Sequence, residues 1–494
     1  MESLERIVHL VDLDVYASSL VEAGGVTYFL GRRGTEKFVG SVGEGNLVGQ
    51  KVGELDNKPI IVGPTDHANA CAIRNALPWT APGLVGLKKS IGMGDRLGVA
   101  TPGHIRAVRG SGLTVLLAQQ SIREMTRTGR SPNDVIDSTT WGVLQEGFGD
   151  GFGSDADHLH TFEDVDSTVE AGFTMFTIDP GQYVDDAAET DDYSILKEKA
   201  SSIDVSALET TLSDISGRYV GKTFDLGEIA ISFDEGTFLR TFVKYARAVA
   251  HIVKMYRHLL TVAHKPFEVE VSIDETDSPT TPADHFFIVT EMKRLGVEWI
   301  AIAPRFVGRF EKGVDYIGDL DVFRASFAEH VRVMKAMGPY KISIHSGSDK
   351  FSIYPIAAEL AGEYLHVKTA GTSYLEALRV IAAVEPDLFR EIFDFALQCY
   401  ETDKATYHVS ADIAKIPPID TITNDRLPGL IDDFNARQVL HVTYGSVLTA
   451  QDGQKFRSKI LTILKQHEEL HYANLKKHLR RHVKGLIGKD VSAL

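Results

Sequence analysis

The stretch FEVEVSIDE, residues 267–275, alternates apolar and polar side chains along its whole length. A period of two is that of a β-strand, in which successive side chains point to opposite faces. One face would carry Glu268, Glu270, Ser272 and Asp274, and the other Val269, Val271 and Ile273. We therefore predict a strand with one polar and one apolar face that ends in acidic residues.

Seven further segments follow the same plan, in which a short strand-like run ends in polar residues. They are SIGMGDRLG (90–98), LTVLLAQQS (113–121), GFGSDADH (151–158), FTMFTIDP (173–180), WIAIAPRF (299–306), KISIHSGS (341–348) and LHVKTAG (365–371). Helical patterns separate them. Eight strands that alternate with helices predict a (β/α)8 barrel over residues 86–380, with the active site at the carboxyl ends of the strands. A doubly wound parallel sheet is the structural alternative.

The barrel interpretation predicts where individual side chains point. Strand residues in a barrel face the interior and the surrounding helices in turn. The apolar faces should meet the helices, which leaves Glu270, Asp274, Lys341 and His345 pointing into the barrel. An alternative places Glu268 and Lys341 on a solvated edge strand, but the apolar opposite face argues against it.

The segments that flank and interrupt the barrel differ in composition. Residues 1–85 contain short strand-like runs between glycine-rich turns, which predict a small α/β module. Residues 182–236 form an acidic, serine-rich insertion, which we expect to cover the barrel mouth, with a solvated loop as the alternative. Residues 381–494 show mostly helical patterns and predict a helical C-terminal extension.

The overall composition limits the class of protein. Of 494 residues, 43% are hydrophobic and 24% are charged, the balance of a soluble globular chain. The net charge of −16 argues against a nucleic-acid partner, which would need a concentrated basic surface. Only two cysteines are present, and the chain shows neither a signal peptide nor a long apolar segment. We expect a cytoplasmic protein that does not contact a membrane.

The segment GFGSDADHLH, residues 151–160, concentrates chemical groups at one strand end. Asp155, Asp157 and His158 are potential bases or metal ligands in a glycine-rich setting that ordinary strands avoid. The segment therefore indicates the polar mouth of an active site. The alternative is an Asp-rich turn that caps the next helix.

Histidines and carboxylates at the strand ends form a pool of possible ligands for a divalent metal. Imidazole and carboxylate groups together suit Zn, Mn, Ni or Fe. The pool consists of His158, Glu270, Asp274, His345 and His408. Gln119 and Gln120 close another strand and Arg123 follows, and these amides and this guanidinium suit the recognition of hydroxyl and carboxylate groups.

HEELH, residues 467–471, matches the HExxH zinc pattern but is not expected to bind metal. It lies in a basic terminal helix. The extended pattern would require Gly at 474 and His at 477, where the chain has Asn474 and Lys477. Few residues remain downstream for a third ligand, so we do not predict a metalloprotease.

Several long segments together resemble the tagaturonate/fructuronate epimerase family of bacterial hexuronate catabolism. They are GDRLGVATPGHIRA (94–107), AQQSIREMTRTGRS (118–131), GFGSDADH, GFTMFTIDP (172–180) and HSGSDKFSIYP (345–355), and the likeness continues through HVTYGSVL (441–448). The resemblance therefore covers most of the chain.

The resemblance implies a metal-dependent enzyme that interconverts D-tagaturonate and D-fructuronate, two sugar acids that differ only at C4. It implies Asp157 as the proton acceptor, Glu270 as the opposing proton donor, and His158 and His345 as metal ligands. His408 is favoured over Asp274 as the third ligand. The substrate carboxylate needs a cation, for which the candidates are Arg305, Lys350 and Lys368.

Two questions of mechanism and class stay open at this point. C4 is not adjacent to the C2 ketone, so inversion can proceed by breaking and remaking the C3–C4 bond or by transient oxidation at C4. The alternatives to an epimerase are a metal-dependent aldolase or ketose isomerase that acts on a sugar acid, and a non-catalytic uronate-binding protein.

Overall fold

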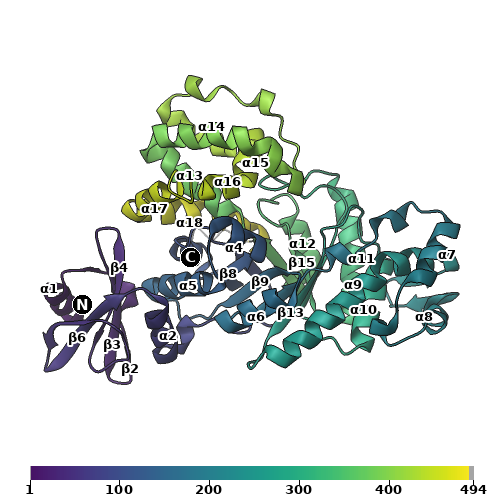
Figure 1. Ribbon diagram of the computed structural model, residues 1–494, viewed down its shortest axis with the longest axis horizontal. Helices are drawn as coiled ribbons and strands as arrows, with labels where there is room; N and C mark the ends of the chain where they lie inside the picture. The colour runs from purple at the N-terminus through teal and green to yellow at the C-terminus, as the bar shows by residue number, and fades with distance from the viewer. Residues whose placement is uncertain (1, 489–494) are drawn as a thin grey trace.

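The computed structural model describes residues 2–488 and contains a closed barrel of eight parallel strands (Figure 1). Around the barrel the strands follow the order β10 (Met175–Ile178), β13 (Glu268–Ile273), β14 (Ala301–Pro304), β15 (Lys341–Ile344), β16 (Leu365–Thr369), β7 (Ser90–Met93), β8 (Thr114–Ser121) and β9 (Gly153–Leu159). Every adjacent pair is parallel. Each strand overlaps one of the eight predicted segments, so the (β/α)8 prediction is confirmed and the doubly wound sheet is excluded.

Side chains alternate along the strands as the barrel interpretation predicted. The apolar side chains of β13 are buried in the core shared with the surrounding helices. Inside the barrel, Ser343 donates a hydrogen bond to Glu270 (3.2 Å), and Lys341 donates one to Ser90 (3.0 Å). Glu268 is also buried and accepts hydrogen bonds from the backbone N–H groups of residues 85 and 86. A solvated edge for this face is therefore excluded.

The helices that follow the strands form the outer layer of the barrel. They are α3 (Thr101–Val108), α4 (Ile122–Thr128), α5 (Pro132–Glu146), α6 (Phe162–Ala171), α9 (Glu235–Val262), α10 (Pro282–Arg294), α11 (Leu320–Met337), α12 (Tyr354–Ala361) and α13 (Thr372–Val384). Four of them begin with reciprocal capping boxes, at Ser121, Ser131, Thr161 and Thr281. Such caps satisfy the free N–H groups of a first turn and define where each helix begins after its loop.

The N-terminal residues form a separate antiparallel sheet beside the barrel (Figure 1). After α1 (Glu2–Val11), the strands are β1 (Asp14–Val15), β2 (Val21–Ala23), β3 (Val26–Arg33), β4 (Glu36–Val42), β5 (Gln50–Leu55) and β6 (Lys58–Pro64). Helix α2 (His67–Ala76) follows and packs against α5 of the barrel. This sheet encloses small apolar cores of its own.

The acidic insertion folds against the outside of the barrel. It contains α7 (Tyr193–Ser202), α8 (Leu212–Tyr219) and the hairpin β11 (Lys222–Asp225) and β12 (Ala230–Phe233), which contact α9 and α10. Its apolar side chains, among them Leu196, Leu208 and Ile215, are buried in the barrel's main core. The prediction that the insertion covers the mouth is therefore wrong, because its spaced apolar residues attach it to the helical layer instead.

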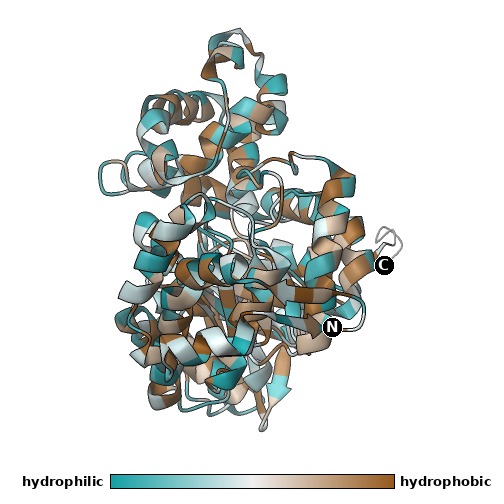
Figure 2. Ribbon diagram, turned by 90° about the vertical axis from the view of Figure 1, so that its right-hand side faces the viewer, coloured by the Kyte–Doolittle hydropathy of each residue, from teal (hydrophilic) through white to brown (hydrophobic). Residues whose placement is uncertain are grey.

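The C-terminal region is helical and stands above the barrel (Figures 1 and 2). It contains α14 (Pro386–Asp403), α15 (Phe434–Val442), α16 (Tyr444–Thr449), α17 (Arg457–Gln466) and α18 (Glu468–Ile487). Together with α13 these helices enclose a second large apolar core, whereas α18 returns to the barrel and packs on α3, α12 and α13. Between Thr406 and Phe434 the chain forms 3-10 segments, the longest of them over Asn424–Asp432, and irregular links.

Two expectations about helices can be compared with the described residues. Among residues 2–488, no helix combines the length and the apolar character that a membrane span requires. The HEELH segment holds no zinc geometry, because Glu468 is buried and forms an ion pair with Arg32 (3.1 Å) while His467 precedes α18.

Candidate active site

An irregularity in β9 turns two consecutive side chains toward the barrel mouth. In a regular strand Asp157 and His158 would face opposite sides of the sheet. The register between β9 and β10 shifts here, and His158 has a positive φ of 51°. A bulge of this kind re-aims a side chain at the end of a strand. Both residues therefore line the same cavity, which we call the mouth cavity.

One buried lysine links three carboxylates beside this cavity, and of the four residues only Asp157 belongs to the cavity lining. Lys368 Nζ lies 2.7 Å from Asp155, 2.9 Å from Asp157 and 3.0 Å from Glu270. It also donates a hydrogen bond to Thr177 (2.7 Å). All of these groups are buried, so the interactions act in a poorly screened environment.

The three carboxyl groups differ in their pKa values. Burial raises the pKa of Asp155 to about 6, since Lys368 offsets only part of the effect and two further carboxylates stand nearby. Burial also opposes ionisation of Asp157 and Glu270, but Lys368 and His345 outweigh it and hold the pKa of both carboxyls below the usual range. Asp157 and Glu270 are therefore anions at neutral pH. Asp157 can accept a proton in this state, whereas Glu270 must first receive one before it can be the proton donor that the resemblance implied.

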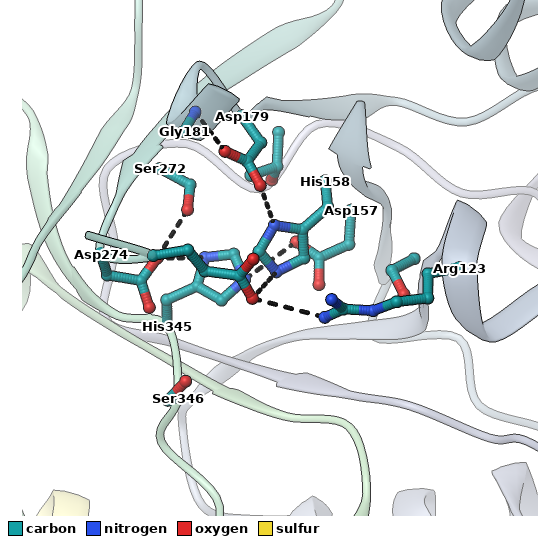
Figure 3. Close-up of polar contacts among 12 residues, drawn as sticks. Arg123, Asp157, His158, Asp179, Gly181, Ser272, Asp274, His345 and Ser346 are labelled. Atoms are coloured by element: carbon teal, nitrogen blue, oxygen red, sulfur yellow. Dashed lines mark hydrogen bonds and ion pairs between the residues drawn. The ribbon is translucent and has the colours of Figure 1, made fainter. Parts of the chain in front are cut away.

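Two histidines, His158 and His345, lie side by side next to Asp157 (Figure 3). The ring centroids of His158 and His345 are 4.3 Å apart. His158 Nδ1 lies 2.6 Å from Asp179, whose other oxygen accepts a hydrogen bond from the N–H of Gly181. This pairing fixes the ring so that Nε2 faces the cavity. His345 lies between two carboxylates, 3.3 Å from Asp157 through Nε2 and 3.3 Å from Glu270 through Nδ1.

The group fits a divalent metal ion. Ligand atoms of Asp157, His158 and His345 lie within 4.8 Å of one another. Neither ring nitrogen of His345 makes an aligned hydrogen bond, although the side chain is buried. Further oxygen donors stand close by, since Glu275 lies 3.7 Å from His158 Nε2 and Asp274 lies 3.8 Å from His345 Nδ1. Imidazole and carboxylate donors in this ratio suit Zn, Mn, Ni or Fe.

His408 is not part of this group. Its side chain is exposed in the C-terminal region, where it lines a second cavity, which we call the outer cavity. Among the described residues it shares no possible metal cluster with the other histidines. The expected third ligand is therefore not brought to the site, because the TYHVSAD segment forms a surface link and no barrel strand. Asp274 and Glu275, at the end of β13, lie closer.

The residues expected to bind substrate have different surroundings. Gln119 and Arg123 line the mouth cavity, where Gln119 donates to Asp157 (3.3 Å) and Arg123 pairs with Glu275 (3.3 Å). Gln120 is occupied by structural hydrogen bonds to the Asp95 backbone and to the Glu124 side chain. The remaining three expected residues are cations with different degrees of access.

Those three cations are Lys350, Lys368 and Arg305. Lys350 lines the mouth cavity, but its ammonium donates to three backbone carbonyls, and its burial lowers the pKa of the amine to about 7. Lys368 is surrounded by carboxylates. Arg305 lines only the outer cavity and donates to the Asp274 carbonyl (3.3 Å).

Several residues of the site were not predicted. Asp179 and Glu275 directly follow β10 and β13, so the polar strand-end signal was present for them. Lys312, Tyr407 and His441 line the mouth cavity from a loop and from the C-terminal region. No strand pattern precedes these three residues, so periodicity offers no signal that could locate them.

Comparison with known proteins identifies the family. A family profile described as tagaturonate epimerase matches residues 16–486. The chain belongs to the tagaturonate epimerase family. The tagaturonate/fructuronate epimerase of Thermotoga maritima is 41% identical over 478 residues, which cover 96% of this chain and 97% of that protein.

A solved structure of the same family has the same fold. The native crystal structure of fructuronate-tagaturonate epimerase from Cohnella laeviribosi is similar to this chain with a TM-score of 0.91 and 35% identity, over 98% of this chain and 99% of that one. A crystal structure of that epimerase with one glycerol bound matches equally well. The resemblance inferred from the sequence motifs is thus confirmed, and this member of the tagaturonate epimerase family is an isomerase that acts on a carbohydrate.

Proposed function

We propose that the protein interconverts D-tagaturonate and D-fructuronate by inverting C4, with a divalent cation held by His158 and His345. The observation that carries this proposal is the position of His345 between Asp157 and Glu270, each 3.3 Å from one ring nitrogen. Two anionic carboxylates beside a metal-ligand pair offer a proton acceptor on either side of a bound sugar.

The reaction that suits these groups breaks and remakes the C3–C4 bond. Asp157 would accept the proton of the C4 hydroxyl as the bond to C3 breaks, which leaves an aldehyde at C4 and an enolate at C2–C3. The aldehyde group then rotates so that its opposite face is presented to the enolate. C3 of the enolate attacks C4 on that face and forms the C3–C4 bond again. The new C4 alkoxide then recovers a proton. A bound divalent cation would supply charge stabilisation for the ketone oxygen.

Glu270 would return that proton from the opposite side, after Lys368 has passed it on from Asp157. The Lys368 ammonium lies within 3.0 Å of both Asp157 and Glu270, so it can pass a proton between the two carboxylates. Burial of the whole cluster excludes bulk water, which would otherwise trap the separated fragments.

Incubation of the purified protein with D-tagaturonate and a divalent metal, followed by NMR, tests the proposal. We expect D-fructuronate to accumulate and, in D2O, the hydrogen on C4 to stay unexchanged, because the C4–H bond never breaks. Deuterium at C4 would contradict the C3–C4 mechanism. Released three-carbon fragments would indicate an aldolase instead, and binding without turnover would indicate a uronate-binding protein.

A further inference from the structure

The mouth cavity is lined by four lysine and arginine side chains. Two of them are paired with carboxylates, and a third has its ammonium hydrogens occupied by backbone carbonyls. Arg96 pairs with Glu124 (2.7 Å), and both are buried. Arg123 pairs with Glu275 (3.3 Å). The Lys350 ammonium donates to the backbone carbonyls of residues 311, 314 and 348. None of these three cations has a free charge to offer a ligand.

Lys312 is the fourth cation and differs from the others. Its ammonium donates to the Ser346 hydroxyl (3.0 Å), which is its one polar contact among residues 2–488. The side chain is half-buried in the loop between β14 and α11. It lines both the mouth cavity and the outer cavity. Lys312 is thus a full charge, partly withdrawn from water, whose hydrogen bond goes to a neutral hydroxyl, although its charge also helps to lower the pKa of the nearby Glu275 carboxyl.

Lys312 lines the same cavity as Asp157 and His345, and a hexuronate carries its carboxylate close to C4. In the ketose numbering, the carboxylate carbon C6 is separated from the reacting C4 by a single carbon, so the two ends are a few ångströms apart. Ser346, the partner of Lys312, directly follows His345 in the chain, and both residues line the two cavities. A sugar whose C4 lies beside Asp157 and His345 can therefore extend its carboxylate toward Lys312.

The negative charge of the site makes such a cation necessary. Asp155, Asp157, Glu270, Asp274 and Glu275 surround the reacting end, and Lys368, Arg123 and the proposed divalent cation together offset only part of their charge. A further carboxylate would be repelled unless an unpaired cation received it. We infer that Lys312 binds the substrate carboxylate and selects a uronate over a neutral ketose. This inference rests on the proposed function.

Kinetics of a Lys312→Met variant test this inference. Met keeps the length of the side chain and removes its charge. D-tagaturonate is compared with D-tagatose, which carries CH2OH in place of the carboxylate. We expect the KM for D-tagaturonate to rise about 10- to 100-fold, the loss associated with one charge-assisted hydrogen bond. The inhibition constant of D-tagatose should stay unchanged, and Lys312→Arg should recover part of the lost affinity.

Arg309→Met serves as the matched control, because the exposed Arg309 side chain lines only the outer cavity and pairs with Glu311 (3.4 Å). It should leave the KM for D-tagaturonate close to that of the wild type. An unchanged KM in Lys312→Met, an equal loss of affinity for both sugars, or a uronate-specific loss in Arg309→Met would each overturn the assignment. If the wild-type protein does not convert D-tagaturonate, the proposed function fails. Calorimetric titration of D-tagaturonate and D-tagatose into the same variants then tests the role of Lys312. A loss of affinity for D-tagaturonate alone, in Lys312→Met alone, would support it.

Discussion

At the scale of residues, the site depends on how one lysine is shared among three carboxylates. Lys368 keeps Asp157 and Glu270 ionised although both are buried, whereas Asp155 retains a raised pKa. A buried carboxylate without such a partner would take up a proton and could no longer act as a base. Lys368 therefore serves to keep these acids ionised rather than to bind the substrate carboxylate.

Neutral isosteres of the two ionised acids should separate catalysis from folding. Asp157→Asn and Glu270→Gln keep the shape of each side chain, so we expect folded proteins whose turnover falls at least about a hundredfold, the lower range for loss of a general acid or base. Initial rates measured by NMR, together with circular dichroism, would check this. Wild-type kinetics in either variant would remove that residue from the mechanism.

Asp179 should act through His158. Asp179→Asn weakens the contact that fixes the His158 ring, so we expect metal affinity to fall about 10- to 100-fold while His158 remains present. Competition with a chromophoric chelator measures the change. The matched control is Asp166→Asn, which alters a similar pair (2.6 Å) between the exposed Asp166 and the half-buried His258, away from the site. Equal affinity in both variants would argue against a positioning role for Asp179.

Single residues could be predicted where the strand pattern extended to them. His345, Glu270 and Asp157 follow from alternation and from the polar ends of strands. His158 needed the bulge in β9 to face the same cavity, and a bulge leaves no trace in a period of two. Lys312 comes from a loop, and its position depends on tertiary packing, which local periodicity does not encode.

At the scale of elements, β15 shows how one short strand serves two purposes. Ile344 is 1% exposed and belongs to the core between barrel and helices, while the next residue, His345, faces the site. Strand ends contribute more to a site than to a core. Truncation of Ile344 should therefore reduce stability, whereas truncation of His345 should reduce metal binding and activity.

His345→Ala should lose bound metal and activity with little loss of stability. Ile344→Ala should instead lower the free energy of unfolding by about 2–5 kcal/mol through the cavity that it leaves, and the folded fraction should keep its metal. Metal analysis and denaturant titrations on both variants would decide this. Metal retained by folded His345→Ala would refute the ligand assignment. A loss of metal in Ile344→Ala together with a loss of stability in His345→Ala would refute the strand register.

Elements were predicted well where their own sequence determines them. All eight barrel strands lie within or beside the expected segments, because alternation and turn residues are local signals. The placement of the acidic insertion could not be predicted in this way. The insertion is acidic and serine-rich in composition, which suggests a solvent-exposed segment. Only the structure shows that a few of its apolar side chains attach it to α9.

At the scale of the whole molecule, a bound cation should join parts of the chain that are far apart in sequence. His158 and His345 lie on strands β9 and β15, on different sides of the barrel. Chelator treatment should abolish turnover and lower the melting temperature, because a ligand of the native state stabilises it. Added Mn, Ni or Zn should restore both. Full activity in protein shown by metal analysis to be metal-free would exclude the cation from the reaction.

The last helix of the chain covers one of the first helices of the barrel. α18 packs on α3, and Leu475 lies so close to Gly103 that a Cβ on that glycine would come within 2.7 Å of it. Synthesis proceeds from the N-terminus, so the ribosome releases every strand of the barrel before the helix that shields α3 exists. Contacts over such a sequence separation form slowly and leave apolar surface exposed meanwhile. During synthesis α3 therefore stays uncovered until α18 has left the ribosome, and this side of the barrel is the part most exposed to aggregation in the meantime.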